Sequence, residues 1–421
     1  MMLAVGRPKQ PGNPWLLVLA GHGPRRWHAL DAAAAPAIGL AIADVRDRFM
    51  PRLQVGPTGK LEPAAALATL QRIQAWCAAG LAVAGWLGYE LGAALESAPT
   101  FPAGSDLPDA DLVAFDPRDL QPVTLPTVPV TAGHVPLPED LLRQEGAFVS
   151  GVRTALAAIA AGEVYQVNLS LQATVSPPAV GWSLPQALAA VLEAQPVPLA
   201  MAWQGDGYRL VSGSMERFLR VEAGTVRSRP IKGTSARGGD ATSDAAQAAA
   251  LVASAKERAE NTMIVDMVRN DLQRACRMGS VTVPVLLEAV PYATLWHLES
   301  EVAGELVEPL DRAALLAATL PPASVTGCPK IQATQVIARL ERRRRGPYCG
   351  ALGLWQPDGH VDLAVGIRQL VVWPDRAVLN VGAGLVADSS PEAEWREVCL
   401  KAASALRLVR ALDAAASHGG S

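Results

Sequence analysis

Residues 348–387, YCGALGLWQPDGHVDLAVGIRQLVVWPDRAVLNVGAGLVA, decide the fold class of this chain. They contain three apolar, strand-like runs, the middle one at 360–373, separated by the turn signals PDG at 357–359 and PD at 374–375. Strands joined by turns this short pair antiparallel, because a parallel crossover needs about a dozen residues or more. The stretch therefore predicts an α+β fold with antiparallel sheets.

A fourth strand and a helix are expected further upstream. Apolar and polar side chains alternate along residues 164–175, VYQVNLSLQATV, which is typical of a strand with two different faces. Residues 139–161 predict a helix that ends at Gly162.

A proline-rich stretch predicts the boundary between two parts of the chain. Nine prolines occur between Pro99 and Pro138, a density typical of an extended connection. We therefore expect an N-terminal lobe, including this connection, at 1–138 and a larger domain at 139–415.

The composition excludes several classes of function. The 421 residues are 50% hydrophobic and 18% charged with a formal net charge of -3, so the chain lacks the basic surface of a nucleic-acid binder. Its five cysteines are odd in number and form no CxxC pair, which argues against a disulfide framework or a zinc site and favours a reducing cytoplasm. No run approaches the roughly 18 apolar residues that cross a bilayer.

Lysine is rare in this chain, so each lysine is a candidate for a special role. An amine can lose its proton and act as a base or nucleophile, which a guanidinium cannot do. The alternative is codon bias, which leaves a few lysines anywhere. Among 37 lysines and arginines, the lysines are Lys9, Lys60, Lys232, Lys256, Lys330 and Lys401.

Lys232 lies in an arginine-rich stretch, VRSRPIKGTSARGGD at 226–240. An ordinary lysine is protonated at neutral pH. We expect the charges of Arg227, Arg229 and Arg237 to favour the neutral amine, because nearby cations disfavour a further positive charge.

Two predicted helices each carry a pair of glutamates on one face. In SAKERAENTMIVDMVRNDLQRA, Glu257 and Glu260 continue the apolar stripe of the helix. A second helix, capped by Ser390, places Glu394 and Glu397 on one stripe with Lys401. Four carboxylates from two helices suit Mg²⁺, although acids at this spacing are also common on solvated helix faces.

Two glycine-containing segments are candidate anion sites. Gly382 and Gly384 bracket Ala383 near a predicted strand end, where backbone N–H groups can approach a carboxylate, although a close strand crossing explains them equally well. Thr326 and Gly327 precede a helix that opens near Pro329, which indicates either an anion site or a plain helix cap.

Single polar residues within apolar runs are weaker signals. His297 is expected to be a core histidine, and Arg368, inside a predicted strand, must pair with an acid or a ligand. The four arginines at 342–345 indicate a solvated helix end without a function.

The order and wording of these segments resemble the chorismate-utilizing enzymes. The resemblance is dense over residues 141–410 and extends to GWLGYELGAALE at 85–96. It implies two antiparallel sheets flanked by helices, with the active site in a cleft between them. The blocks that carry it are GEVYQVNLS, SGSMERFLRV, RPIKGTSARG, KERAENTMIVDMVRNDL, HLESEVAGEL, SVTGCPKIQA, RRGPYCGALGLW, DLAVGIRQ and GAGLVADSSPEAEWREVCLKA.

The resemblance also implies roles for individual residues. Glu260 and Glu397 match the Mg²⁺ ligands, and Glu257 and Glu394 match their neighbours around the metal. The residues that match groups holding the carboxylates of chorismate are Tyr348, Arg368, Gly382, Ala383, Gly384 and Lys401, and those beside its ring are His297, Thr326 and Gly327.

The branch of the family is predicted by Lys232. Members that form 4-amino-4-deoxychorismate carry lysine in the Pro-Ile-X-Gly-Thr segment, whereas the anthranilate branch carries alanine there. Glu216 resembles the family's general acid/base, although the usual Ser-Pro-Glu is Ser-Met-Glu here. The resemblance implies that Lys232 adds to C2 of chorismate as the C4 hydroxyl leaves with help from Glu216, after which ammonia adds at C4.

This branch implies two partners and leaves three alternatives open. Ammonia is expected from a separate glutamine amidotransferase, because the chain shows no glutaminase block, and the product is expected to pass to an aminodeoxychorismate lyase. The alternatives are anthranilate synthase component I, a non-catalytic chorismate-binding subunit and an isochorismate-forming enzyme.

Overall fold

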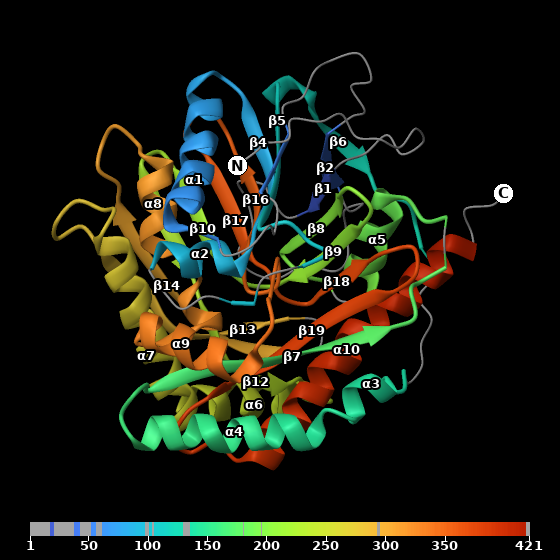
Figure 1. Ribbon diagram of the computed structural model, residues 1–421. Helices are drawn as coiled ribbons and strands as arrows, with labels where there is room; N and C mark the ends of the chain where they lie inside the picture. Colours follow the sequence, from blue (N-terminus) through green and yellow to red (C-terminus); the bar gives the residue numbers. More distant parts are fainter. Residues whose placement is uncertain are drawn as a thin grey trace.

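Two antiparallel β-sheets with flanking helices form the computed structural model of the chain (Figure 1). The structure describes residues 17–20, 38–42, 52–55, 61–96, 101–102, 105–128, 135–179, 181–194, 196–292 and 295–417.

Sheet 1 has nine strands. In spatial order these are β15 (Gly327–Cys328), β7 (Gln166–Val175), β19 (Ala377–Leu385), β18 (Gln369–Val372), β9 (Arg209–Ser214), β8 (Leu199–Gln204), β1 (Leu17–Ala20), β2 (Ile38–Ile42) and β6 (Leu120–Thr124).

In the described part of the chain, sheet 2 has ten strands. Nine of them follow one another in spatial order, and the tenth, β13 (Thr282–Pro291), pairs with β14 (Leu295–Glu305) outside that order. The others are β12 (Ile231–Ala236), β14 (Leu295–Glu305), β11 (Thr225–Arg229), β10 (Arg217–Glu222), β17 (Val361–Val365), β16 (Ala351–Trp355), β4 (Ala82–Leu87), β5 (Ala110–Phe115) and β3 (Arg52–Val55). Each described pairing in both sheets is antiparallel, as for β16 with β17 and β18 with β19. The predicted fold class is confirmed.

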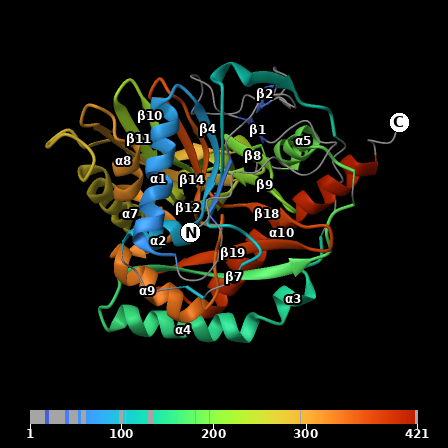
Figure 2. The same cartoon turned by 45° about the horizontal axis from the view of Figure 1, so that its top comes forward.

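Helices cover the outer faces of the sheets. Helix α10 (Pro391–Ser417) packs on β19, on α4 (Glu145–Ala160) and on α5 (Leu184–Ala194), while α7 (Ala255–Gln273) packs on β14 and β12 (Figures 1 and 2). The remaining helical segments are α1 (Pro63–Ala78), α2 (Tyr89–Leu95), η1 (Pro117–Asp119), α3 (Glu139–Leu142), α6 (Ala241–Ala253), α8 (Arg312–Thr319), η2 (Ala323–Val325) and α9 (Lys330–Glu341). In the described part of the chain, no helix has the length and apolarity that crossing a membrane requires.

The run at 360–373 does not form a single strand. It divides into β17, which belongs to sheet 2, and β18, which belongs to sheet 1. The chain crosses at Gly366, where an added Cβ would lie 2.0 Å from the carbonyl oxygen of Pro347, and at Arg368, whose φ is 52°. The prediction of one continuous strand is wrong, because period and apolarity do not reveal a change of sheet.

The helix expected over 139–161 is divided at Arg143 and Gln144 into α3 and α4. The Gln144 side-chain amide donates to the carbonyl oxygens of Asp140 and Gln172, and the Asp140 carboxylate accepts from the Thr174 backbone. These contacts with β7 favour a turn over a continuous helix. Gly162 follows α4 with φ 76°, as expected for a helix end.

Of the arginines at 342–345, Arg342 is exposed at the end of α9, the next two are half-buried and Arg345 is buried, so the prediction of a solvated helix end is wrong for Arg345. Arg345 is 2% exposed, donates to the carbonyl oxygens of Val325 and Asn168, and pairs with Glu341 at 2.6 Å. Its guanidinium also lies over the ring of Tyr89. Except for Glu341, these partners come from distant parts of the sequence, which is why local charge density did not reveal the burial.

Strands from both predicted parts of the chain share the two sheets. β4 pairs with β16 in sheet 2, and β1 pairs with β8 in sheet 1. Parts of the proline-rich connection lie outside the described residues, and the boundary near residue 138 stays a prediction. All five cysteines are free.

An ion pair between two strands from the N-terminal part of the chain is buried between the sheets. Asp111 on β5 is fully buried and accepts two hydrogen bonds from the Arg52 guanidinium, at 2.8 and 2.6 Å. It also accepts from the indole of Trp203 on β8 in sheet 1 and from the hydroxyl of Tyr208, which lies just before β9. The carboxylate therefore connects the two sheets, within a core of Trp86, Met201 and other apolar side chains.

We predict that Asp111→Asn destabilises the protein by about 3–5 kcal/mol, because it leaves the Arg52 charge buried without its carboxylate. Urea unfolding measures the change. Asp116→Asn is the matched control, since its pair with Arg118 lies at the surface and contributes far less. Equal unfolding midpoints for Asp111→Asn and the unmodified protein would contradict the prediction.

Candidate functional site

The two sheets approach each other where β12 faces β19. Lys232 belongs to β12 in sheet 2 and Gly384 to β19 in sheet 1. A Cβ added to Gly384 would lie 3.0 Å from Lys232 Nζ and 3.3 Å from the side-chain nitrogen of Gln166. The missing side chain of Gly384 therefore makes room for the lysine amine.

Gly233 brings Lys232 close to the acidic face of α7. Its φ is 95°, and an added Cβ would lie 3.1 Å from Glu257 Oε2 and 3.0 Å from Leu298 Cβ. The register of β12 against β14 shifts between Ile231 and Thr234, so the strand bulges at Lys232. This bulge aims the lysine away from the regular pairing of the sheet.

Glu216 lies between β9 and β10 and is 5% exposed. Its backbone is anchored, because Glu216 N donates to Ser214 Oγ and Val365 N donates to Glu216 O. Burial raises the pKa of its carboxyl to about 7, although Ser324 and the Lys232 charge act to lower it. A carboxyl that is half protonated near neutrality can serve as both acid and base.

The four predicted metal-site glutamates gather from α7 and α10. Burial raises the pKa of Glu257, Glu260 and Glu394, and a neighbouring carboxylate raises each of them further. Burial also acts to raise the pKa of Glu397, but Lys401, at 2.6 Å, holds it below its usual value. This concentration of negative charge favours a bound cation.

The donor set fits a hard divalent cation. Glu394 is 3% exposed, and its Oε2 is buried without a hydrogen-bond partner. In the described part of the chain, however, no group of three or more His, Cys, Asp or Glu side chains already stands at metal-binding spacing. The arrangement suits Mg²⁺, which keeps several waters and takes few protein ligands.

A positive region faces the glycines of β19. Lys401 Nζ donates to the carbonyl oxygen of Gly382 at 2.9 Å, and Arg368 donates to the backbone of Lys401 at 3.4 Å. Burial lowers the pKa of both side chains. Tyr348 is 5% exposed, and burial raises the pKa of its hydroxyl, which therefore stays protonated. These donors suit an anionic ligand.

His297 lies on β14 with a neutral imidazole. Burial, followed by the charge of Arg368, lowers its pKa to about 4. Its Nδ1 lies 3.1 Å from Thr234 Oγ1, whereas its Nε2 is buried without a hydrogen-bond partner. His297 is thus more than the satisfied core histidine that its sequence context indicates.

Thr326 and Gly327 join the site to β7. The Thr326 hydroxyl is engaged, because it donates to the Pro322 carbonyl oxygen at 2.8 Å. Gly327 pairs with Val167, and an added Cβ would lie 2.2 Å from the carbonyl oxygen of Gln166. The close approach of two strands therefore accounts for this glycine.

The three arginines around Lys232 are each paired with an acid. Arg227 contacts Glu301, and Arg237 contacts Asp244. Arg229 contacts Glu299 at 2.6 Å and Glu288 at 2.9 Å. Their charge is compensated locally, so the expectation that they act on the lysine amine is not supported by this arrangement.

Gln166 is a site residue that the sequence reasoning missed. Its side chain is 1% exposed, its nitrogen lies near Gly384, and its Oε1 has no hydrogen-bond partner. In sequence it is one of several polar residues that alternate along a strand. Its position beside β15 and Lys232 distinguishes Gln166 from the other polar residues of the strand. Only the folded structure creates this position.

We predict that His297 stays neutral well below the pKa of an ordinary histidine. Its pKa of about 4 lies below the usual 6.5, so the stability that it contributes is fully present above pH 6.5 and is lost as pH falls towards 4. NMR titration of the imidazole, assigned with His297→Asn, measures the value. Titration near pH 6.5 would show that water reaches the ring and would contradict this environment.

The chain is similar to known proteins over much of its length. The chain is 45% identical over 223 residues to aminodeoxychorismate synthase of Streptomyces pristinaespiralis, covering 53% of this chain and 31% of the relative. It is 39% identical over 236 residues to aminodeoxychorismate synthase component 1 of Klebsiella aerogenes, covering 56% and 52%. The chain thus spans about half or less of the length of these curated relatives.

A solved structure and a family extend the comparison over most of the chain. The crystal structure of anthranilate synthase component I from Streptococcus pneumoniae superposes with a TM-score of 0.64 at 26% identity, covering 77% of this chain and 80% of that one. The family described as chorismate binding enzyme matches residues 27–407. The chain therefore belongs to the chorismate binding enzyme family.

Proposed function

We propose that this chain converts chorismate and ammonia to 4-amino-4-deoxychorismate, as an aminodeoxychorismate synthase component I. The observation that carries the proposal is the placement of the Lys232 amine between the sheets, beside Gly384 and within electrostatic reach of Glu216. A lysine and a glutamate of intermediate pKa are the two groups that a covalent amination requires.

The proposed chemistry proceeds in two substitutions. The Lys232 amine forms a bond to C2 of chorismate while Glu216 gives its proton to the C4 hydroxyl, which leaves as water. Ammonia then forms a bond to C4 and the bond from C2 to Lys232 breaks. The excess proton on the new amino group passes to the Glu216 carboxylate, which restores the starting state.

Chorismate is a dianion, and the positive region of β19 would hold its carboxylates. Lys401 and Arg368 supply charge, Tyr348 supplies a hydroxyl, and the backbone of 382–384 allows close approach. The free Nε2 of His297 and the segment at Thr326 and Gly327 are assigned to the ring of the substrate.

Magnesium is part of the proposal. Glu260 and Glu397 would hold the ion, with Glu257 and Glu394 beside it, since these carboxylates concentrate negative charge. Mg²⁺ supplies charge neutralisation for a substrate carboxylate. Lys256 and Lys401 lie 3.8 and 2.6 Å from Glu260 and Glu397 and partly compensate their charge.

Two partners complete the proposed reaction. A glutamine amidotransferase subunit supplies ammonia by docking to the chain, and an aminodeoxychorismate lyase consumes the product. We place the protein in the cytoplasm, where chorismate and a reducing environment coincide with five free cysteines. Anthranilate synthase component I is the second candidate, supported by the structural similarity to the Streptococcus pneumoniae enzyme.

The proposed function predicts that chorismate, Mg²⁺ and ammonia yield 4-amino-4-deoxychorismate, detected as 4-aminobenzoate after addition of lyase. Without ammonia, peptide mapping is expected to find a chorismate-derived adduct on Lys232. Lys232→Ala should lose the adduct and nearly all turnover, by a factor of about 100 or more. Anthranilate fluorescence in place of 4-aminobenzoate would support the second candidate, and an adduct elsewhere would overturn the role of Lys232.

Magnesium dependence gives a separate prediction. Glu260→Gln should raise the Mg²⁺ concentration for half-maximal activity by about tenfold or more, because one charged ligand is lost. Calorimetric titration with Mg²⁺ measures the same loss without turnover. Glu392→Gln is the control, because Glu392 is an exposed glutamate on α10 that pairs with Arg153 and is not one of the four proposed metal-site glutamates. Equal Mg²⁺ affinity in both variants would contradict the proposed ligand.

A further inference from the structure

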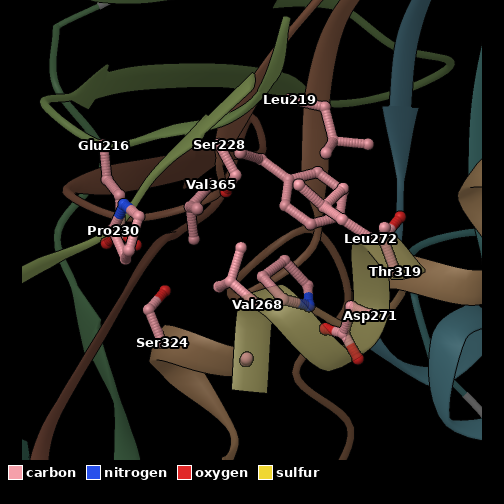
Figure 3. A pocket seen from close by; sticks show the side chains of 13 residues that line it. Glu216, Leu219, Ser228, Pro230, Val268, Asp271, Leu272, Thr319, Ser324 and Val365 are labelled. Carbon is pink, nitrogen blue, oxygen red and sulfur yellow. The ribbon is translucent and has the colours of Figure 1, made fainter. Parts of the chain in front are cut away.

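A small cavity lies directly behind Glu216 (Figure 3). Its free interior holds about one molecule of the size of water. It is enclosed between β10, β11 and the C-terminal half of α7, with η2 and the end of α8 closing it. Its lining residues are Glu216, Phe218, Leu219, Ser228, Pro230, Val268, Asp271, Leu272, Thr319, Pro322, Ala323, Ser324 and Val365.

The polar groups of this cavity lie at its two ends. Glu216 and Ser324 lie at one end and Asp271 and Thr319 at the other, with Val268 between them (Figure 3). The walls between the ends are largely apolar. Apart from Ser228, which also lines the cavity, its hydrogen-bonding side chains therefore lie at the two ends.

The far end carries no uncompensated charge. Asp271 is 4% exposed and accepts from Lys330 Nζ at 2.7 Å. The same ammonium donates to the carbonyl oxygen of Thr319 at 2.9 Å. Lys330 thereby neutralises Asp271 and fastens α9 to this wall, so the interior does not require a bound cation.

The position of Glu216 relates this cavity to the reaction. In the proposed function, on which this inference rests, Glu216 gives its proton to the departing C4 hydroxyl. The same carbon then receives ammonia, so the nucleophile must arrive on the side of Glu216. A small molecule in this cavity would lie next to Glu216 and therefore, in the proposed function, next to the carbon that reacts.

We propose that this cavity is the site that holds neutral ammonia before it attacks C4. Ammonia has about the size of water, and the serine, threonine and carboxyl groups at the ends can exchange hydrogen bonds with it. The apolar walls disfavour an ammonium ion along the part of the cavity that lies away from the Glu216 carboxyl, because a charge there would lack a partner. The same walls exclude larger amines by their volume.

Ammonia, Lys232 and Glu216 together account for the electrons and protons of this step. The ammonia lone pair forms the C4–N bond, and the electron pair of the C2–N bond returns to Lys232, which leaves as a neutral amine. The product nitrogen then carries one excess proton. The Glu216 carboxylate accepts that proton, so each turnover consumes one ammonia and releases one water.

Substitutions at Val268 test the proposal by reducing the cavity in one variant and enlarging it in another. Both assays use the full chain and free ammonia. Val268→Ile adds a methylene to the cavity and is expected to raise the KM for ammonia by about fivefold or more, with the KM for chorismate unchanged. Val265→Ile is the matched control, because Val265 lies on the same helix, is buried and does not line the cavity. Both constants should stay unchanged in this control.

Val268→Ala enlarges the cavity and is expected to permit turnover of methylamine, detected by mass spectrometry of the N-methylated product. Val268→Ala removes side-chain volume, whereas Val268→Ile adds it. The alanine variant therefore tests the site even if the isoleucine variant packs poorly. An unchanged KM for ammonia in Val268→Ile, or an equal rise in Val265→Ile, would overturn the ammonia site and leave a cavity that holds water only. Absence of 4-aminobenzoate from the unmodified protein would instead overturn the proposed function itself, and this inference with it.

Discussion

The short crossing of the chain from β17 to β18 is the constraint on which the site depends. Three residues, 366–368, take the backbone from sheet 2 to sheet 1. Gly366 has no room for a side chain against the Pro347 carbonyl oxygen, and the carbonyl oxygen of Arg368 accepts from Gly213 on β9. A connection this short fixes the distance between the sheets. The lysine of one sheet can therefore reach the glycines of the other.

Charge compensation explains how so polar a site remains folded. Carboxylates from two helices lie near Lys232 and Lys401. Burial raises the pKa of Glu257, Glu260 and Glu394, whereas Lys401 holds the pKa of Glu397 below its usual value. Unpaired charges in such an interior are costly, so each charge requires a partner, a proton or a ligand. The buried Glu394 Oε2 and His297 Nε2, which lack partners, lie where the proposed metal and substrate would supply them. The same polarity suits the anionic substrate and the cation of the proposed function.

The sequence predicted the regular elements well and their connections poorly. Alternation and cap residues identified β7 and the start of α10 at Pro391, because these signals act between neighbours in the chain. The division of 360–373 between two sheets depended on a steric contact between Gly366 and Pro347. This contact exists only in the folded chain. The burial of Arg345 likewise depended on Val325 and Asn168. Such partners leave no periodic signal.

The sequence by itself determined the antiparallel fold class, and it supplied the residues of the proposed chemistry, namely Lys232, Glu216 and the glutamate pairs. Both follow from local patterns and from resemblance between ordered segments. The tertiary structure alone decided that Gln166 joins Lys232 over Gly384, and that a water-sized cavity ends at Glu216. Distances between strands of different sheets decide these features. The physical reason is that side chains from distant segments share one interior, where packing and charge act on all of them together.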